Sequence, residues 1–328
     1  MGGKARIAII GAGLTGLTLA KALEDIAEVT VFEKSRGLGG RMSTRRAAPF
    51  AFDHGAQYFS AKGQDFSEFL APYLASGVVQ PWAPRRVVLP MGAGAPPEWS
   101  APRYVAVPAM TALAKALSEG LTIARAAHVE RIARSEAGWQ LTCRDGIAHG
   151  PFDWVISTAP AFQTAALMPE VFAGQAALAA ARMQGCYSLM LGFATPCSLD
   201  WDAAWVREGP LAWIAVDTSK PGRAGPQSIV AQASNDWADV NLERDQAEVQ
   251  AALQDAFSAV TGCNPEAADC VSLHRWRYAN VSVPSGAPFL LDAPNGLAAA
   301  GDWCGAGKVE AAFESGSALA AAVQEHLG

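Results

Sequence analysis

The chain has 328 residues, of which 51% are hydrophobic and 17% are charged. This length and composition allow two compact units with buried cores. The formal net charge of −6 provides no basic surface for a phosphate backbone, so nucleic acid is not an expected partner. No stretch reaches the roughly 20 uninterrupted apolar residues that cross a bilayer, so we expect no membrane association.

The six cysteines are scattered without a C-x-x-C pair or the Cys/His spacing of a metal site. They are Cys143, Cys186, Cys197, Cys263, Cys270 and Cys304. This pattern favours a reducing compartment over a disulfide framework, so we predict a cytoplasmic protein without a bound metal. Glycines interrupt the apolar stretch 7–20, which indicates a buried strand rather than a secretory segment.

The first elements predicted along the chain form a βαβ unit. Residues 5–10 are a short β-branched run without alternation, which is typical of a parallel strand covered on both faces. Residues 14–23 have the apolar spacing of a packed helix, and residues 29–32 predict a second strand.

The central part of the chain is less regular. Residues 61–103 contain seven prolines, which predicts irregular or short elements and an insertion on the substrate side. A helix is expected over 108–117, strands over 122–143 with a turn near residues 136–138, and a buried strand over 154–158.

A second, sheet-containing domain is predicted between about residues 185 and 285, with a helix from about 242 to 260. Residues 297–302 indicate a return to the first domain, and a long helix follows from Val309. The predicted fold is α/β, with a discontinuous dinucleotide-binding domain. We assign residues 1–60, 104–184 and 286–328 to that domain and residues 61–103 and 185–285 to the substrate domain.

Residues 11–16 read GAGLTG between the first strand and its helix. In such a fingerprint the first glycine permits the tight turn, the second lets the backbone approach a pyrophosphate, and the third allows close helix packing. The helix N-terminus adds free N–H groups and a positive dipole. Glu33, about 20 residues on, is placed to accept the ribose hydroxyls. The pattern predicts a Rossmann-like fold but does not choose between NAD and FAD.

Three further segments resemble motifs of flavin amine oxidases. Residues 33–41, EKSRGLGGR, resemble their second nucleotide motif, and residues 52–59, FDHGAQYF, resemble their segment beside the flavin. Residues 301–312 resemble their C-terminal motif, with the pair Gly301-Asp302 first. The resemblance implies FAD, with Asp302 near the ribitol or phosphate region and a helix N-terminus facing the isoalloxazine, where its dipole would stabilise negative charge.

The likeness narrows to bacterial renalases, within the flavin amine oxidase and glutathione reductase-2 type superfamily. It rests on residues 34–41, on SKPGR at 219–223, on HRWRY at 274–278 and on GDWC at 301–304. It implies a fold similar to para-hydroxybenzoate hydroxylase and monoamine oxidase, with non-covalent FAD. The implied reaction oxidises isomeric dihydronicotinamide dinucleotides to NAD(P)+ with dioxygen and gives hydrogen peroxide.

Two alternatives stay open: a flavin amine oxidase with a small amine substrate, and a flavin-binding regulatory protein without turnover. The single dinucleotide fingerprint favours a substrate that itself supplies the hydride, because no second fold is present for a nicotinamide reductant. Cys270 lies too far upstream of Gly301, and Cys304 after it, for the flavin linkage of some amine oxidases.

The candidate site residues fall into two groups. The predicted cofactor-binding residues are Gly11, Gly13, Leu14, Thr15, Gly16, Glu33, Lys34, Arg36, Gly39, Gly40, Arg41, Asp53, Gly55, Ala56, Val129, Gly301, Asp302, Val309 and Glu310. The predicted catalytic residues are Gln57, Tyr58, His274, Trp276 and Lys308. Gln57 and Tyr58 are expected at the flavin edge, His274 and Lys308 as positive charges for the reaction with dioxygen, and Trp276 as a stacking surface for a ring substrate.

Overall fold

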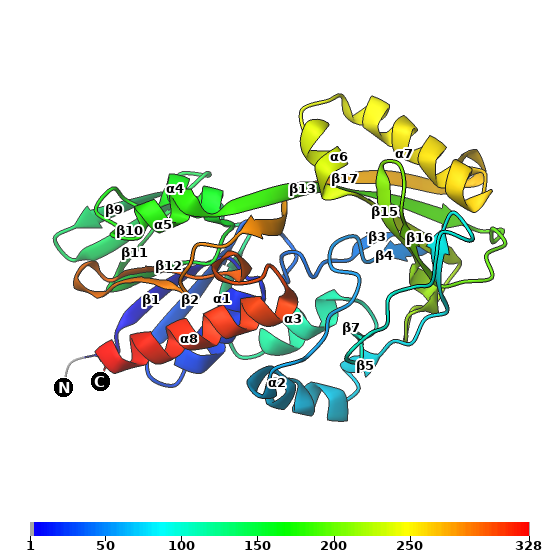
Figure 1. Ribbon diagram of the computed structural model, residues 1–328. Coiled ribbons are helices and arrows are strands. Elements are labelled where there is room, and N and C mark those ends of the chain that lie inside the picture. Colours follow the sequence, from blue (N-terminus) through cyan, green and yellow to red (C-terminus); the bar gives the residue numbers. More distant parts are fainter. Residues whose placement is uncertain (1–2, 328) are drawn as a thin grey trace. The chain divides into compact units, whose positions relative to one another are not determined.

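The computed structural model describes residues 3–327. The chain divides into two compact units, and each is assembled from separate stretches of sequence (Figure 1). Unit 1 comprises residues 1–41, 113–183 and 281–328, and unit 2 comprises residues 42–112 and 184–280. The expected boundaries differ from this division mainly in two places, because residues 42–60 and 104–112 group with unit 2.

A six-stranded sheet forms the centre of unit 1. In sheet order its strands are β18 (Leu290–Asp292), β19 (Leu297–Ala299), β12 (Trp154–Ser157), β1 (Arg6–Ile10), β2 (Glu28–Glu33) and β8 (Thr122–Arg125). The strands from β19 to β8 are parallel, and β18 is antiparallel to β19. Residues 7–10 of β1 are buried, which confirms the predicted strand covered on both faces.

Two helices lie on one face of this sheet, α1 (Leu14–Leu23) and α8 (Val309–Leu327) (Figure 1). They approach closely: the Thr15 hydroxyl donates to the Ala312 carbonyl at 2.8 Å, and a Cβ on Gly316 would lie 2.7 Å from the Thr15 carbonyl oxygen. The remaining elements of unit 1 are α3 (Thr111–Leu117, begun in unit 2), β9 (Val129–Ser135), β10 (Gly138–Cys143), β11 (Ala148–Phe152), α4 (Ala161–Leu167) and α5 (Gln175–Ala180). Strands β9 to β11 form an antiparallel sheet whose Trp139 and Phe152 pack in one core with Phe32.

Unit 2 is built on a second six-stranded sheet. In sheet order its strands are β17 (Cys270–Val283), β13 (Arg182–Phe193), β16 (Gln227–Ala233), β15 (Leu211–Val216), β14 (Ala203–Val206) and β6 (Arg86–Leu89). Helices α6 (Asn235–Val240) and α7 (Gln246–Thr261) cover one face, where Val249, Leu253 and Phe257 join the core. The hairpin of β3 (Arg45–Ala47) and β4 (Phe50–Phe52) packs against Met190 and Val230.

Two expectations about this unit need correction. The short strands and the irregular stretch 90–103 confirm part of the first expectation, but a helix of 12 residues does not fit it. Residues 61–103 contain the helix α2 (Gln64–Ala75), besides β5 (Val79–Pro81), which pairs with β7 (Tyr104–Ala106). Pro72 lies inside this helix and has no N–H for the carbonyl four residues earlier, and the buried Phe66 and Leu70 anchor the helix despite that loss.

The second error concerns the cysteines, because Cys197 and Cys263 form a disulfide across 66 residues of sequence. The spacing of cysteines carries no information about a pair brought together by tertiary packing. Within residues 3–327, no helix is both long and apolar enough to span a membrane.

Candidate functional site

The glycine fingerprint of unit 1 forms a tight turn between β1 and α1. Gly11 has φ +107°, a conformation that side chains rarely adopt. A Cβ on Gly16 would lie only 2.0 Å from the Gly11 carbonyl oxygen, so close packing of turn and helix requires glycine there. A Cβ on Gly13, in contrast, would meet nothing within 4 Å. The backbone at Gly13 therefore faces open space.

The second glycine motif lies directly against the first. The Gly39 N–H donates to the Ala12 carbonyl at 2.9 Å, and a Cβ on Gly40 would lie 3.4 Å from the Cα of Gly13. Helix α1 has no side-chain cap and no acidic residue in its first turn. Its first N–H groups and the positive end of its dipole are thus available to an anion beside two glycine-lined loops.

Glu33 connects these two loops. Its Oε2 accepts the Ala12 N–H at 2.9 Å and its Oε1 accepts the Ser35 N–H at 2.7 Å. A carboxylate has about four acceptor positions, so these contacts leave acceptor capacity for a ribose hydroxyl. The predicted binding residue is therefore also a structural tie between the fingerprint and the second motif.

The second motif meets the C-terminal motif through an ion pair, since an Arg41 Nη2 lies 2.5 Å from Asp302 Oδ1. Asp302 is buried, whereas Lys34 and Arg36 are exposed. Trp303 favours glycine at position 301, because a Cβ added to Gly301 would lie 2.3 Å from Trp303 Nε1. These contacts place three of the predicted motifs on adjacent parts of unit 1.

The remaining candidates in unit 1 have mixed positions. The Thr15 side chain is engaged by α8, so its backbone N–H is the part that remains for a cofactor. Leu14 is buried at the start of α1, and Val129 is a core residue of β9. Lys308 is exposed just before α8, and Val309 and Glu310 form the first turn of that helix.

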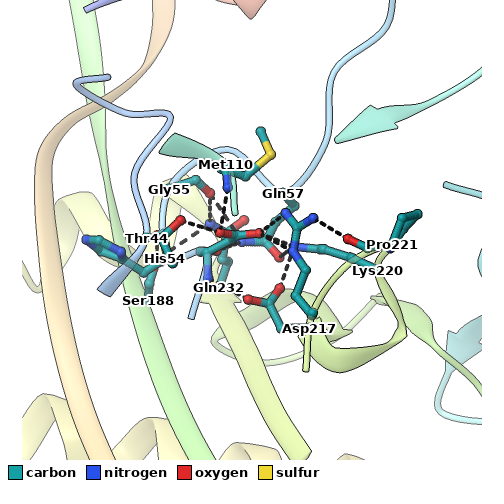
Figure 2. A network of polar contacts seen from close by, with 12 residues as sticks. Thr44, His54, Gly55, Gln57, Met110, Ser188, Asp217, Lys220, Pro221 and Gln232 are labelled. Carbon is teal, nitrogen blue, oxygen red and sulfur yellow. Dashed lines mark hydrogen bonds and ion pairs between the residues drawn. The ribbon is translucent and has the colours of Figure 1, made fainter. Parts of the chain in front are cut away.

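Unit 2 holds a buried charged network around Asp53, drawn in Figure 2. Its Oδ1 accepts the Thr44 hydroxyl at 2.5 Å and the Met110 N–H at 3.0 Å. Its Oδ2 accepts Arg223 Nη2 at 2.5 Å and Nε at 3.2 Å. Asp53 thus has a structural role in unit 2 that the sequence prediction did not include.

Lys220 and Asp217 complete this network. The Lys220 ammonium, whose side chain is 0% exposed, donates to Asp217 Oδ1 and lies 3.7 Å from Asp53 Oδ2. The other Asp217 oxygen accepts the Asp53 N–H at 2.5 Å. Two acids and two cations, counting Arg223, are buried together, so each charge is compensated.

Burial affects the two carboxyl groups differently. Desolvation alone would raise the pKa of Asp53, but Lys220, Arg223 and the Thr44 hydrogen bond outweigh it and hold this pKa below its ordinary value. Burial raises the pKa of Asp217 to about 6, although Lys220 acts in the opposite direction. Of the two acids, Asp53 therefore keeps its charge to lower pH, whereas Asp217 takes up a proton as the pH falls below about 6.

Gln57 joins the network through its side-chain amide (Figure 2). Its Nε2 donates to the Asp53 carbonyl and, at 3.3 Å, to the Gly55 carbonyl, while its Oε1 accepts from Lys220 at 3.3 Å. The Gly55 carbonyl also accepts Gln232 Nε2 at 2.8 Å. The segment around Ala56, predicted to lie beside the flavin, is thus held rigidly by buried polar contacts.

Three rings form a second group in unit 2. His54 and His274 meet edge-on with centroids 4.8 Å apart, and Trp276 lies 5.2 Å from His54 and 4.3 Å from His274. Burial lowers the pKa of each histidine to about 4, with Arg45 contributing. His274 is therefore uncharged at neutral pH and does not supply the positive charge expected of it.

Sequence reasoning missed the charged residues of the network. The motif SKPGR at 219–223 contains Lys220 and Arg223, but the resemblance assigns neither side chain a role. Asp217 precedes it by two residues. The one available signal was a lysine and an aspartate three residues apart after an apolar strand, which equally describes an exposed turn.

Two family models match the chain. Residues 9–73 match an NAD(P)-binding Rossmann-like domain, and residues 96–324, well over half of the chain, match the flavin containing amine oxidoreductases. The chain belongs to this family. It is an FAD-dependent oxidoreductase, which sets aside the alternative of a regulatory protein without turnover.

Solved structures share the fold over nearly the whole chain. A protein described as a protoporphyrinogen oxidase from Exiguobacterium sp. 255-15 is 13% identical, with a TM-score of 0.78 over 98% of this chain and 99% of its own. Cyclohexylamine oxidase from Brevibacterium oxydans IH-35A is 15% identical, with a TM-score of 0.71 over 99% and 100%. At such identities the likeness shows the fold alone, and it confirms the predicted α/β, amine-oxidase-like architecture.

Among curated proteins, 4,4'-diapophytoene desaturase of Staphylococcus aureus (strain Newman) is 36% identical over 76 residues. The match covers 20% of this chain and only 15% of the desaturase.

The cradle in unit 1 fits the pyrophosphate of FAD. The open space at Gly13, the uncapped start of α1 and the left-handed Gly39 and Gly40 leave room and N–H donors for phosphate oxygens. Glu33 has acceptor capacity for the ribose hydroxyls.

Proposed function

We propose that this chain oxidises isomeric dihydronicotinamide dinucleotides to NAD(P)+, with dioxygen as the electron acceptor. In the balanced reaction, the dihydronicotinamide gives up a hydride, and dioxygen receives the two electrons, that hydrogen and one solvent proton to become hydrogen peroxide. FAD, when bound, supplies the two-electron relay for this transfer. The renalase-like segments 219–223 and 274–278 support the proposal beyond the family assignment.

The observation that carries the proposal is the packing of His54, His274 and Trp276 against one another, which removes much of the water around both imidazoles. With their pKa held near 4, His54 and His274 are weak bases at neutral pH. A dihydronicotinamide becomes an aromatic cation by losing hydride alone, so its oxidation requires no base. The carboxylate of Asp53 is likewise occupied by Lys220 and Arg223. These side chains suit a donor that is oriented and desolvated rather than deprotonated.

In this proposal the residues of unit 1 bind the cofactor and those of unit 2 orient the substrate. The fingerprint, Glu33 and the pair Arg41–Asp302 hold FAD, without a covalent bond between the cofactor and the protein. Trp276 and His274 offer flat surfaces for a ring, and the Gln57 amide and Tyr58 lie on the rigid segment that the resemblance assigns to the flavin edge. Lys308 provides an exposed positive charge for the reaction with dioxygen.

Oxidation of a small amine is the second candidate, favoured by the cyclohexylamine oxidase among the structural relatives. Anaerobic rapid mixing of the purified holoprotein separates the two. We expect dihydronicotinamide isomers made by borohydride reduction to bleach the flavin absorbance in a single fast phase, and cyclohexylamine and putrescine to leave it unchanged. Bleaching by the amines alone would replace the proposal with amine oxidation. Denaturation by acid should release all of the yellow colour into solution if the cofactor is non-covalent.

A further inference from the structure

A group of aromatic and arginine side chains in unit 2 lies outside the network and the histidine pair. We call it the Trp99 cluster; its members are Tyr58, Trp82, Arg86, Trp99, Arg103, Trp205 and Trp213. It contains four of the ten tryptophans of the chain. The Tyr58 ring is at its centre, with centroid distances of 5.3 Å to Trp99 and 5.5 Å to Trp213.

Both arginines of the cluster lie over aromatic faces. The guanidinium of Arg86 is 4.5 Å and that of Arg103 is 4.8 Å from the Trp99 ring centroid. Each donates one hydrogen bond to a nearby carbonyl, at 2.9 Å to Pro97 and 2.7 Å to Ala101. Within residues 3–327, neither guanidinium has a carboxylate within ion-pair distance. The cluster therefore carries two uncompensated positive charges.

The cluster is also rich in donors that lack an acceptor. Trp82 Nε1, Trp213 Nε1 and Arg103 Nε are buried and have no hydrogen-bond partner within the described residues. Trp82 is 3% exposed and Trp213 is 8% exposed. Because buried donors in native proteins are nearly always satisfied, three unsatisfied donors around one ring indicate a missing acceptor. A ligand with several anionic oxygens would satisfy both the donors and the guanidiniums.

The segment that carries Trp99 offers a route to these donors. Residues 90–103 connect β6 to β7 without helix or strand, and Met91 at its start is 69% exposed. Gly92 and Gly94 have φ of +92° and +120°, so the chain turns sharply there. Connections of this length inside a compact unit are commonly binding loops or lids. Movement of this segment would withdraw the Trp99 ring and uncover the face of Tyr58.

We propose that the Trp99 cluster binds the half of a dinucleotide that carries adenine and phosphate. This proposal rests on the proposed function, in which that half is the adenosine diphosphate part of the substrate. The guanidinium forks match phosphate oxygens, and the aromatic faces can stack a base. Two uncompensated guanidiniums would repel a protonated amine, so the cluster also discriminates between the two candidate substrate classes.

The binding test titrates FAD-saturated holoprotein with ADP-ribose and measures the dissociation constant by isothermal titration calorimetry. We expect wild type to bind, Arg103→Met to bind about 10- to 100-fold more weakly, and Arg207→Met to match wild type. Arg207 is the matched control because it is an exposed arginine in the same unit, just after β14. No binding by wild type, or equal binding by Arg103→Met, overturns the site. Inorganic diphosphate binding as tightly as ADP-ribose overturns its assignment to a nucleotide.

The turnover test compares a dihydronicotinamide dinucleotide with the corresponding riboside, which has no phosphate. We expect Arg103→Met to lower kcat/KM about 10- to 100-fold for the dinucleotide and less than about twofold for the riboside. Equal losses for both would mean that Arg103 is merely structural and would overturn the proposal. If wild type oxidises neither compound, the proposed function fails, while ADP-ribose binding still decides the site. Arg86→Met replaces Arg103→Met if the latter does not fold.

Discussion

The Arg41 guanidinium and the Asp302 carboxylate meet at 2.5 Å across 261 residues of sequence. The two side chains belong to the second nucleotide motif and to the C-terminal motif, which were each predicted to contact the cofactor. Asp302 is buried with a side-chain exposure of 6%, whereas Arg41 keeps 31%. The pair therefore fixes the relative position of these two segments of unit 1 and leaves part of the guanidinium accessible.

We predict that Arg41→Met weakens FAD binding about 10- to 100-fold, because it removes a phosphate donor and leaves the Asp302 carboxylate without its partner. Fluorescence titration of the apoprotein with FAD measures this change. Arg41→Lys should recover part of the affinity, since a point charge replaces the planar fork. The control is Arg144→Met, an exposed arginine of unit 1 that pairs with Glu130. An unchanged dissociation constant in Arg41→Met would contradict the role of this pair.

Two alanine substitutions in the fingerprint should have opposite effects on fold and cofactor. Gly16→Ala places a Cβ 2.0 Å from the Gly11 carbonyl, so we expect the apoprotein to lose several kcal/mol of unfolding free energy. Gly13→Ala meets no protein atom within 4 Å, so the apoprotein should melt like wild type but bind FAD at least about tenfold more weakly. Thermal melts with and without FAD distinguish the two. If Gly13→Ala binds FAD with wild-type affinity, the pyrophosphate does not lie at this turn.

The fingerprint region could be predicted because its signals are local. Residues 5–16 combine a buried strand, three glycines and the start of a helix in one short stretch of sequence. Glu33 follows at the end of the next strand. Each element reports its own structure through periodicity and backbone conformation. The structure therefore matches the predicted βαβ unit closely.

The charged network of unit 2 left no comparable local signal. Asp53 is 164 residues from Asp217 and 170 from Arg223, and burial of Lys220 opposes the usual exposure of lysine. Proline content misled in the same unit, because α2 accommodates Pro72 near its end. The charged residues of the network meet only through the long-range pairing of strands in unit 2. That pairing cannot be predicted from the local pattern of a single sequence.

Lys220→Met should lower the unfolding free energy by about 3–5 kcal/mol, since it leaves buried acids one cation short. The double variant Lys220→Met/Asp217→Asn removes one charge of each sign and keeps an acceptor for the Asp53 N–H. We expect it to regain at least half of the loss in urea unfolding. If both variants are equally destabilised, packing rather than charge compensation explains the role of Lys220.

The histidine pair should make stability depend on pH. The pKa of both His54 and His274 falls from an ordinary value of 6.5 to about 4 in the folded chain, mainly through burial. Between these pH values the unfolded chain binds more protons at the two histidines than the folded chain, so the histidine pair makes stability rise with pH. Asp217, whose folded pKa is raised to about 6, contributes in the opposite direction below that pH. Each histidine contributes a slope of up to about 1.4 kcal/mol per pH unit. The stability that this slope represents is present above about pH 6.5 and is lost as the pH falls to about 4.

His274→Gln removes one of these two titrating groups, so we expect the rise in unfolding free energy between about pH 4 and 6.5 to become shallower by up to about 1.4 kcal/mol per pH unit. Denaturant unfolding at half-unit steps of pH measures the slope. His326→Gln, which changes an exposed histidine near the end of α8, is the control variant. An identical slope in His274→Gln would show that its ring titrates alike in both states, and the argument that the proposed oxidation proceeds beside a neutral histidine would then lose its basis.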